Sequence, residues 1–191
     1  IFEADFMPSS YGFRPRRRAQ DAIAEIHFYA SRGYVQVFEA DITACFDEID
    51  HDALMQRVRS RITDKRVLRL IRGFLKAGVL SEDGVNRDTF TGTPQGGILS
   101  PLLANIALSV VDEHFQRKWD ALGPQWSRTK HQRAGGATMK MVRYADDFVI
   151  CCRGTAAHAM EVMRAMMRRL RLEVNEAKTS LRRVPAQGVD F

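Results

Sequence analysis

Apolar and polar positions follow two different periods along this chain. In four segments, apolar residues recur at helical spacing and the borders carry Gly or Asp residues that favour helix ends. These segments are 17–31, 50–62, 64–78 and 156–172. A longer helix is expected in "GTPQGGILSPLLANIALSVVDEHF", with Ser100 as its N-cap and Pro101 in its first turn.

Shorter segments show the alternation of β-strands. They are 34–42, a hairpin from Met139 to Cys152, a short hairpin from Leu80 to Thr91, and strands within 172–184. Residues 123–138 are basic, contain Gly and are expected to form an irregular connection. The mixture predicts an α+β domain with an antiparallel sheet packed on helices.

The charge balance narrows the range of partners. The chain has 191 residues, a formal net charge of +6 and a pI of about 9.5. A basic chain suits a polyanion such as nucleic acid, although many basic domains bind nothing acidic. No apolar run is long enough to span a membrane, and no signal peptide is recognisable, so no membrane partner is expected.

The cysteines indicate the redox compartment of the protein, and the two ends of the sequence indicate whether it is a fragment. Cys45, Cys151 and Cys152 form no CxxC pair, and all three are expected to be small buried side chains in a reducing compartment. The chain begins with Ile and stops at "QGVDF", which suggests a fragment of a longer protein.

Two adjacent acids, Asp146 and Asp147, interrupt the apolar hairpin "MVRYADDFVICC". Aspartates are common in turns, because they hydrogen-bond their own backbone. They also suit a metal site, where a cation relieves the repulsion between neighbouring carboxylates. A metal site needs a further ligand, and Asp41 is the candidate, at the C-terminal end of the strand that starts at Tyr34. An Asp that simply ends a strand is the alternative.

Carboxylates, a polyanionic substrate and basic surroundings together suit two-metal phosphoryl transfer. Four sequence blocks point to a known family. They are "SYGFRPRRRAQDAI", "FEADITACFDEIDHDAL", "GTPQGGILSPLLANI" and "VRYADDFVI", and a fifth, "LEVNEAKTSL", is weaker. In this order they resemble the fingers–palm region of a reverse transcriptase, most closely the bacterial group II intron type. "YADD" alone is unspecific, but together with "TPQGGILSPLLANI" it is highly specific. The resemblance implies the palm of a right-hand polymerase with part of the fingers.

The resemblance also assigns the metal ligands. It implies that Asp41 and Asp146 bind two Mg²⁺ ions, for which Mn²⁺ can substitute, and that the backbone carbonyl of Ile42 joins them. Asp147 belongs to the same acidic motif, with a lesser direct role.

The nucleotide-binding residues follow from the same resemblance. Phe46 would lie under the incoming sugar, where a rigid ring leaves no room for a 2′-hydroxyl; a core Phe is the alternative. Gln95 would approach the incoming nucleotide and template base, and Gly96 would allow close backbone approach. A plain turn before the helix would also explain the glycine. Lys178 would lie near the triphosphate and assist catalysis, unless it is an exposed structural lysine.

Arg14 and Arg17 match a nucleic-acid-binding block of the family, in which Gly is usual at position 16 and Ser at position 18. This chain has Arg16 and Arg18 there, which questions whether the loop keeps the same turn. A solvated basic loop is the alternative to phosphate contact.

Residues 1–191 are therefore expected to be a partial reverse transcriptase domain. Residues 1–33 would form a fingers-side segment and 34–191 the palm with finger-side inserts, without the upstream finger motifs or the downstream primer grip and thumb. The expected activity is RNA-directed DNA synthesis in the bacterial cytoplasm, with an RNA template, a DNA primer, dNTPs and its own intron RNA as partners. An RNA-binding, splicing-assisting module is the alternative; an RNA-synthesising polymerase or a nuclease fits the motifs less well.

Overall fold

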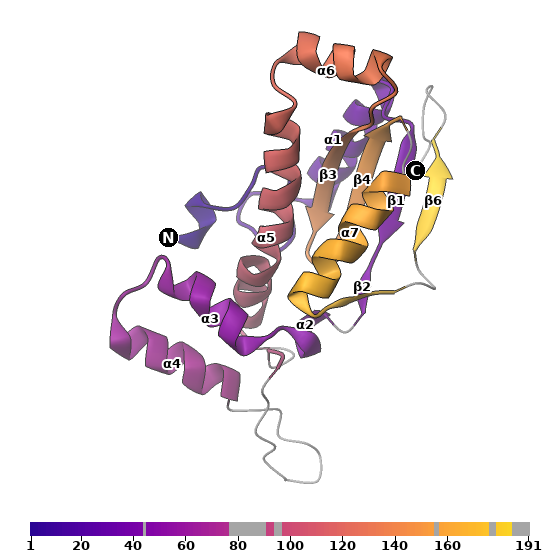
Figure 1. The fold of residues 1–191 in the computed structure, drawn as a ribbon. Coiled ribbons are helices and arrows are strands. Elements are labelled where there is room, and N and C mark those ends of the chain that lie inside the picture. The colour runs from indigo at the N-terminus through magenta and orange to yellow at the C-terminus, as the bar shows by residue number, and fades with distance from the viewer. Residues whose placement is uncertain (44, 77–90, 94–96, 155–156, 176–178, 185–191) are drawn as a thin grey trace.

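Short strands and longer helices make up this chain (Figure 1). The computed structural model describes residues 1–43, 45–76, 91–93, 97–154, 157–175 and 179–184. Its elements in chain order are η1 (Phe2–Ala4), α1 (Ala19–Ser31), β1 (Gln36–Ala40), β2 (Ile42–Thr43), α2 (Cys45–Glu48), α3 (His51–Arg59), α4 (Lys65–Lys76), α5 (Ser100–Ala121), α6 (Gln125–Arg133), β3 (Thr138–Tyr144), β4 (Asp147–Arg153), α7 (Ala157–Leu170), β5 (Glu173–Val174) and β6 (Ser180–Arg183).

Four strands form an antiparallel sheet in the order β3-β4-β1-β6. β3 and β4 are the two arms of the predicted hairpin, and β1 lies beside β4 with Ala40 opposite Phe148. β2 and β5 pair separately, with Ile42 opposite Val174. The hairpin turn and the end of β1 therefore lie at the same end of the sheet, which is the lower end in Figure 1.

Helices cover both faces of the sheet. Figure 1 shows α5 and α7 on the near face and α1 behind the strands. Successive side chains of β4 point to opposite faces of the sheet. Phe148 and Ile150 pack with α5 and α7 on one face, and Cys151 packs with residues of α1 on the other. The methionines of α7 contribute to the core, since Met163 and Met167 are buried in the same cluster.

A second apolar cluster joins α3, α4 and the first turns of α5. Leu54, Val58 and Leu75 are buried there. Asp50 caps α3 by accepting a 2.8 Å hydrogen bond from the backbone N–H of Ala53, as the sequence indicated. Leu70 of α4 has the helical spacing of an apolar face, with Val67, Ile71 and Phe74, but it is 73% exposed.

Two expectations are wrong. Residues within the supposed irregular connection form helix α6, which buries none of its own residues and therefore shows no apolar period. The guanidinium of Arg128 lies 4.0 Å above the Trp119 ring and holds α6 against α5. The N-cap of α5 is Leu99; Ser100 is already the first helical residue, while Pro101 does lie in the first turn.

Other expectations hold or fall outside the described residues. As expected, Cys45, Cys151 and Cys152 are buried, and they form no disulfide with one another. The hairpin predicted from Leu80 lies almost entirely outside the described residues. Within the described part of the chain, no helix combines the length and the apolar character needed to cross a bilayer.

Candidate active site

The predicted hairpin places Asp146 in a tight turn. Tyr144 pairs with Asp147, so Ala145 and Asp146 alone connect the two strands. Ala145 has a φ of 58°, the left-handed conformation that two-residue hairpin turns require. Asp146 is half-buried, whereas Asp147 begins β4 and is exposed.

The register of the sheet brings Asp41 to this turn. Ala40, the last residue of β1, lies opposite Phe148. Asp41, which follows β1, therefore lies beside Asp147 at the start of β4, next to the turn that contains Asp146. Asp41 is half-buried, and its backbone carbonyl accepts a 2.9 Å hydrogen bond from the N–H of Asn175. The structure thus brings together two acidic segments about a hundred residues apart in sequence, as predicted.

The thiol of Cys45 reports the negative potential at this end of the sheet. Burial raises the pKa of Cys45 to about 12, the charge of Asp146 adds to that shift, and Asp41 contributes a smaller part in the same direction. The guanidinium of Arg143 opposes them. Several carboxylates thus act on this end of the sheet, and a negative potential of this kind favours a cation.

The donor atoms suit Mg²⁺ held jointly with substrate phosphates. Among the described residues, no group of three or more His, Cys, Asp and Glu side chains is arranged to hold a metal by itself. Carboxylates at the ends of two strands are nevertheless hard oxygen ligands, and Mg²⁺ is usually bound by one or two carboxylates together with water and phosphate. The side chain of Ile42 is a hydrocarbon buried in the core, so the backbone carbonyl is the atom of this residue that could bind a metal.

Phe46 lies in α2, directly after the acidic end of β1. Its ring packs edge-to-face on Phe13, with ring centroids 6.3 Å apart, and it is partly buried beside the second apolar cluster. Sequence reasoning missed Phe13, which is 54% exposed and has a φ of 56°. An aromatic residue within the basic loop was the only available signal.

The two arginines of the N-terminal loop have different surroundings. Arg14 is buried and donates hydrogen bonds to Glu3, to the carbonyl of Met7 and to the carbonyl of Ser10. These contacts lie within the loop, so its predicted role toward nucleic acid gains no support from the geometry. Arg17 donates a 2.5 Å hydrogen bond to the carbonyl of Pro8 and remains partly exposed.

Three residues predicted for the site, Gln95, Gly96 and Lys178, lie outside the described residues. Their roles remain predictions. The short described segment 91–93 does approach the site's neighbourhood, because the N–H of Thr93 donates a 2.6 Å hydrogen bond to the carbonyl of Phe46.

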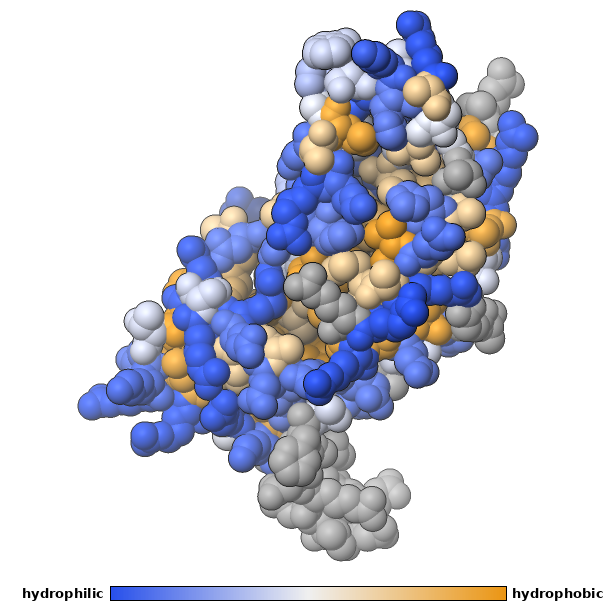
Figure 2. Space-filling model, viewed as in Figure 1, coloured by the Kyte–Doolittle hydropathy of each residue, from blue (hydrophilic) through white to orange (hydrophobic). Residues whose placement is uncertain are grey.

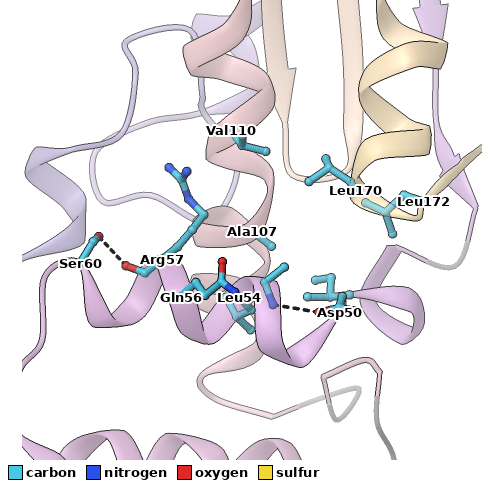
Figure 3. Close-up of a pocket in the computed structure, with 11 residues that line it drawn as sticks. Asp50, Leu54, Gln56, Arg57, Ser60, Ala107, Val110, Leu170 and Leu172 are labelled. Atoms are coloured by element: carbon cyan, nitrogen blue, oxygen red, sulfur yellow. Dashed lines mark hydrogen bonds between the residues drawn. The ribbon is translucent and has the colours of Figure 1, made fainter.

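A pocket of about 400 Å³ lies elsewhere, between α3, α5 and the end of α7 (Figure 3). Leu54, Ala107, Val110, Leu170 and Leu172 give it apolar walls, and Asp50 and Arg57 add charge. It contains none of the residues predicted for the active site. The acidic end of the sheet is therefore the candidate active site on grounds of chemistry.

On the face formed by α5 and α7, hydrophilic side chains lie beside apolar ones (Figure 2). Arg164 and Arg168 of α7 are exposed on this side of the sheet. These two arginines thus lie on the surface, where a partner with phosphate groups could contact them.

An antiparallel sheet with helices packed against it and carboxylates at adjacent strand ends is the arrangement expected for the palm of a right-hand polymerase. The profile of the family described as reverse transcriptase (RNA-dependent DNA polymerase) matches residues 2–190. The chain belongs to this family.

Individual relatives agree with the family. Protein YkfC of Escherichia coli (strain K12) is 34% identical over 205 residues, which cover 95% of this chain and 53% of YkfC. The group II intron-encoded protein LtrA of Lactococcus lactis subsp. cremoris is 32% identical over 229 residues, covering 94% of this chain and 38% of LtrA. The chain thus spans about half the length, or less, of these curated relatives.

A solved structure shares the fold at low sequence identity. Telomerase from Candida albicans, determined with a fragment of telomeric RNA, has a TM-score of 0.63 and 16% identity. The match covers 96% of this chain and 32% of the telomerase chain. The predicted α+β right-hand palm is confirmed.

Proposed function

We propose that this chain forms the palm and part of the fingers of an RNA-directed DNA polymerase that adds deoxynucleotides to a primer 3′ end. The carrying observation is that Asp41 and Asp146 lie at the ends of adjacent strands in a chain of the reverse transcriptase family. In this proposal residues 1–33 belong to the fingers side and 34–191 to the palm with finger-side inserts.

The acidic residues would hold the metal. Asp41 and Asp146 supply carboxylates, Ile42 a backbone carbonyl, and Asp147 a weaker contribution from the start of β4. Two Mg²⁺ ions, when bound, activate the attacking hydroxyl and stabilise the departing oxygen. The protein's part is to hold both carboxylates at one end of the sheet, which the pairing of β1 with β4 favours.

The nucleotide would lie beside these carboxylates. Phe46 excludes a 2′-hydroxyl by its rigid ring, while Gln95 and Gly96 approach the nucleotide and the template base. Lys178 neutralises the leaving pyrophosphate. The position of α2 immediately after the acidic end of β1 supports the role of Phe46.

The partners would be an RNA template, a DNA primer and dNTPs, together with the chain's own group II intron RNA. The net charge of +6 and the similarity to LtrA, a group II intron-encoded protein, support an RNA partner. An RNA-binding, splicing-assisting module with little polymerase activity would use the same basic surface. It would have no need for two acidic segments brought together, which favours the polymerase.

Primer extension on an RNA template with Mg²⁺ and dNTPs tests this function. The intact protein that contains these residues is compared with its Asp146→Ala and Asp52→Ala variants. Asp52 is an exposed carboxylate of α3, and its side chain lies 3.6 Å from that of Arg72. DNA synthesis should fall at least about a hundredfold for Asp146→Ala, because a metal ligand is lost, and should be unchanged for Asp52→Ala.

Two outcomes would contradict this proposal. RNA binding without extension by the unsubstituted protein would favour the splicing module. Extension that survives Asp146→Ala would remove the hairpin from the catalytic centre.

A further inference from the structure

A buried arginine stands directly behind the acidic turn. Arg143 lies near the end of β3, three residues before Asp146, in an otherwise apolar stretch of strand. Its side chain is 1% exposed, and the Asp112 side chain with which it pairs, from α5, is 0% exposed. A charged group this deep is costly unless all its hydrogen-bonding capacity is satisfied.

The structure satisfies that capacity completely. Nε and Nη2 donate to the two carboxylate oxygens of Asp112 at 2.9 and 2.7 Å. Nη2 also donates to Ser10 Oγ at 2.8 Å, and Nη1 donates to Asn105 Oδ1 at 2.9 Å. The remaining bond, from Nη1 to the carbonyl of Ala145, measures 2.6 Å. A guanidinium has five N–H groups, so every one has a partner.

The bond to Ala145 reaches the acidic turn itself. The carbonyl of Ala145 belongs to the peptide group that continues into the backbone nitrogen of Asp146, and a peptide group is planar. Fixing this oxygen therefore fixes the direction in which Asp146 leaves the turn. Ala145 has a φ of 58°, a conformation that persists only where its surroundings enforce it.

The N-terminal loop presses on the same turn from its other side. A Cβ added to Gly12 would lie 2.1 Å from the backbone nitrogen of Ala145, so only glycine permits this contact. Asn105 binds both parts, since its Nδ2 donates to the carbonyl of Gly12 at 2.8 Å while its Oδ1 accepts from Arg143. One side chain of α5 thus ties the loop to the guanidinium.

We propose that Arg143, held by Asp112 and Asn105, is a positioning residue that aims the Asp146 carboxylate at its divalent cation. This inference rests on the proposed function and adds the residues that set the geometry of its metal ligand. A buried ion pair is seldom more stabilising than apolar residues of similar volume, so stability alone does not account for it. Residues that orient a metal ligand affect metal affinity by about 10–100-fold.

The test measures metal binding without turnover. Mn²⁺ is titrated into the complex of the intact protein with RNA template, dideoxy-terminated primer and dNTP, and the free ion is followed by electron paramagnetic resonance. The binding that Asp146→Ala abolishes gives the Kd. Arg143→Lys keeps the charge beside Asp112 but cannot also reach Ala145, and Asn105→Ala removes one acceptor while leaving the ion pair in place.

Arg57→Lys is the matched control. Arg57 likewise pairs with a carboxylate of α5, Glu113, and donates to a hydroxyl, Ser109 Oγ, at 2.8 Å. Its side chain borders the pocket of Figure 3. Within the described part of the chain, its side-chain bonds go to α5 and not to the acidic turn. Its substitution should leave the Mn²⁺ Kd unchanged.

The expected result is a Kd raised about tenfold or more in Arg143→Lys and a few-fold in Asn105→Ala. In extension assays the half-saturating Mg²⁺ concentration should rise equally, while the KM for primer–template stays constant. A merely structural role would lower the active fraction and leave both metal constants unchanged, which would overturn the inference.

If Arg143→Lys shows no cooperative unfolding, Asn105→Ala decides, and an unchanged Kd there refutes the inference. The two proposals fail differently. If the unsubstituted protein extends primers and the metal constants of the variants stay normal, only the positioning role is wrong. If the unsubstituted protein neither extends primers nor binds Mn²⁺ through Asp146, the proposed function itself fails.

Discussion

Arg16 occupies a backbone conformation that its side chain disfavours. Its φ is 61°, in the left-handed region, at a position where the family usually has Gly. The loop therefore has at Arg16 a backbone conformation that glycine adopts without strain. A non-glycine residue in this region costs about 1–2 kcal/mol.

We predict that Arg16→Gly is more stable than Arg16→Ala by about 1 kcal/mol, since both lose the charge but only glycine relieves the backbone. Urea unfolding of the two variants measures the difference. Part of the gain is offset because glycine adds freedom to the unfolded chain. Equal midpoints for Gly and Ala would show that the turn costs nothing.

Phe46 carries a prediction about sugar selection. Replacement by Val opens space beneath the nucleotide sugar, so the ratio of ribonucleotide to deoxyribonucleotide incorporation should rise about 10–100-fold. Phe46→Tyr keeps the ring and should keep the discrimination. Single-nucleotide extension with each sugar gives both ratios. Unchanged discrimination in the Val variant would return Phe46, with its partner Phe13, to a packing role.

Helix α1 begins with half of a capping arrangement. The Asp21 carboxylate accepts a 3.0 Å hydrogen bond from the backbone N–H of Arg18, the N-cap residue. The family usually has Ser at this position, whose hydroxyl would accept a backbone N–H in return. The exposed ion pair between Arg18 and Asp21 at 3.3 Å is a weak substitute.

Arg18→Ser should therefore be more stable than Arg18→Ala by about 1 kcal/mol, because only Ser completes the cap. Thermal unfolding of both variants provides the comparison, and the circular dichroism of the folded state controls for helix content. A Ser variant no more stable than the Ala variant would mean that the first turn of α1 is satisfied without a side-chain cap.

Sequence periodicity predicts an element when that element buries a face. The helices α1, α3 and α7 and the hairpin of β3 and β4 each do so, and their patterns predicted them. Helix α6 buries no residue and is held through Arg128 on Trp119, a contact between separate segments that no local pattern encodes. The N-cap of α5 was predicted at Ser100, because Ser is a favoured cap residue, whereas the observed N-cap, Leu99, has no side-chain acceptor that could have indicated it.

The acidic ends of β1 and β4 could be expected to meet because two-metal chemistry needs carboxylates from separate segments. The hydrogen-bond network of Arg143 behind these strand ends could not be expected from the sequence. Arg143 pairs with Asp112, 31 residues earlier, and Ser10, 133 residues earlier, and nothing in the sequence around either partner indicates the contact. Among the described residues, the buried side chains that hold the acidic turn in place could therefore not be predicted from the sequence.

At the scale of the whole molecule, the buried thiols make stability depend on pH. Burial raises the pKa of Cys45, Cys151 and Cys152 to about 12 from the ordinary value of 9.0. Above pH 9 the unfolded chain loses thiol protons that the folded chain retains. The stability from these neutral thiols is present in full below pH 9 and is lost as the pH rises toward 12.

We predict that the free energy of unfolding falls steadily between pH 9 and 11. Urea midpoints measured across this range under reducing conditions test it, and Cys152→Ala should show a shallower fall than the unsubstituted protein. The tyrosine hydroxyls of Tyr11 and Tyr29, whose pKa values burial also raises, act in the same direction at higher pH. A midpoint constant up to pH 11 would contradict the prediction.

The N-terminal loop that presses on the acidic turn also lies along the outer side of β3, the first strand of the sheet. The N–H of Arg143 donates to the carbonyl of Ser9 and the N–H of Tyr11 to the carbonyl of Arg143, both at 2.8 Å. An open strand edge invites pairing with other chains and aggregation. Residues 9–11 thus occupy hydrogen-bonding groups that a strand of another chain would need. A protein shortened so as to lack them would have an unpaired strand edge, prone to aggregation, beside the acidic end of the sheet.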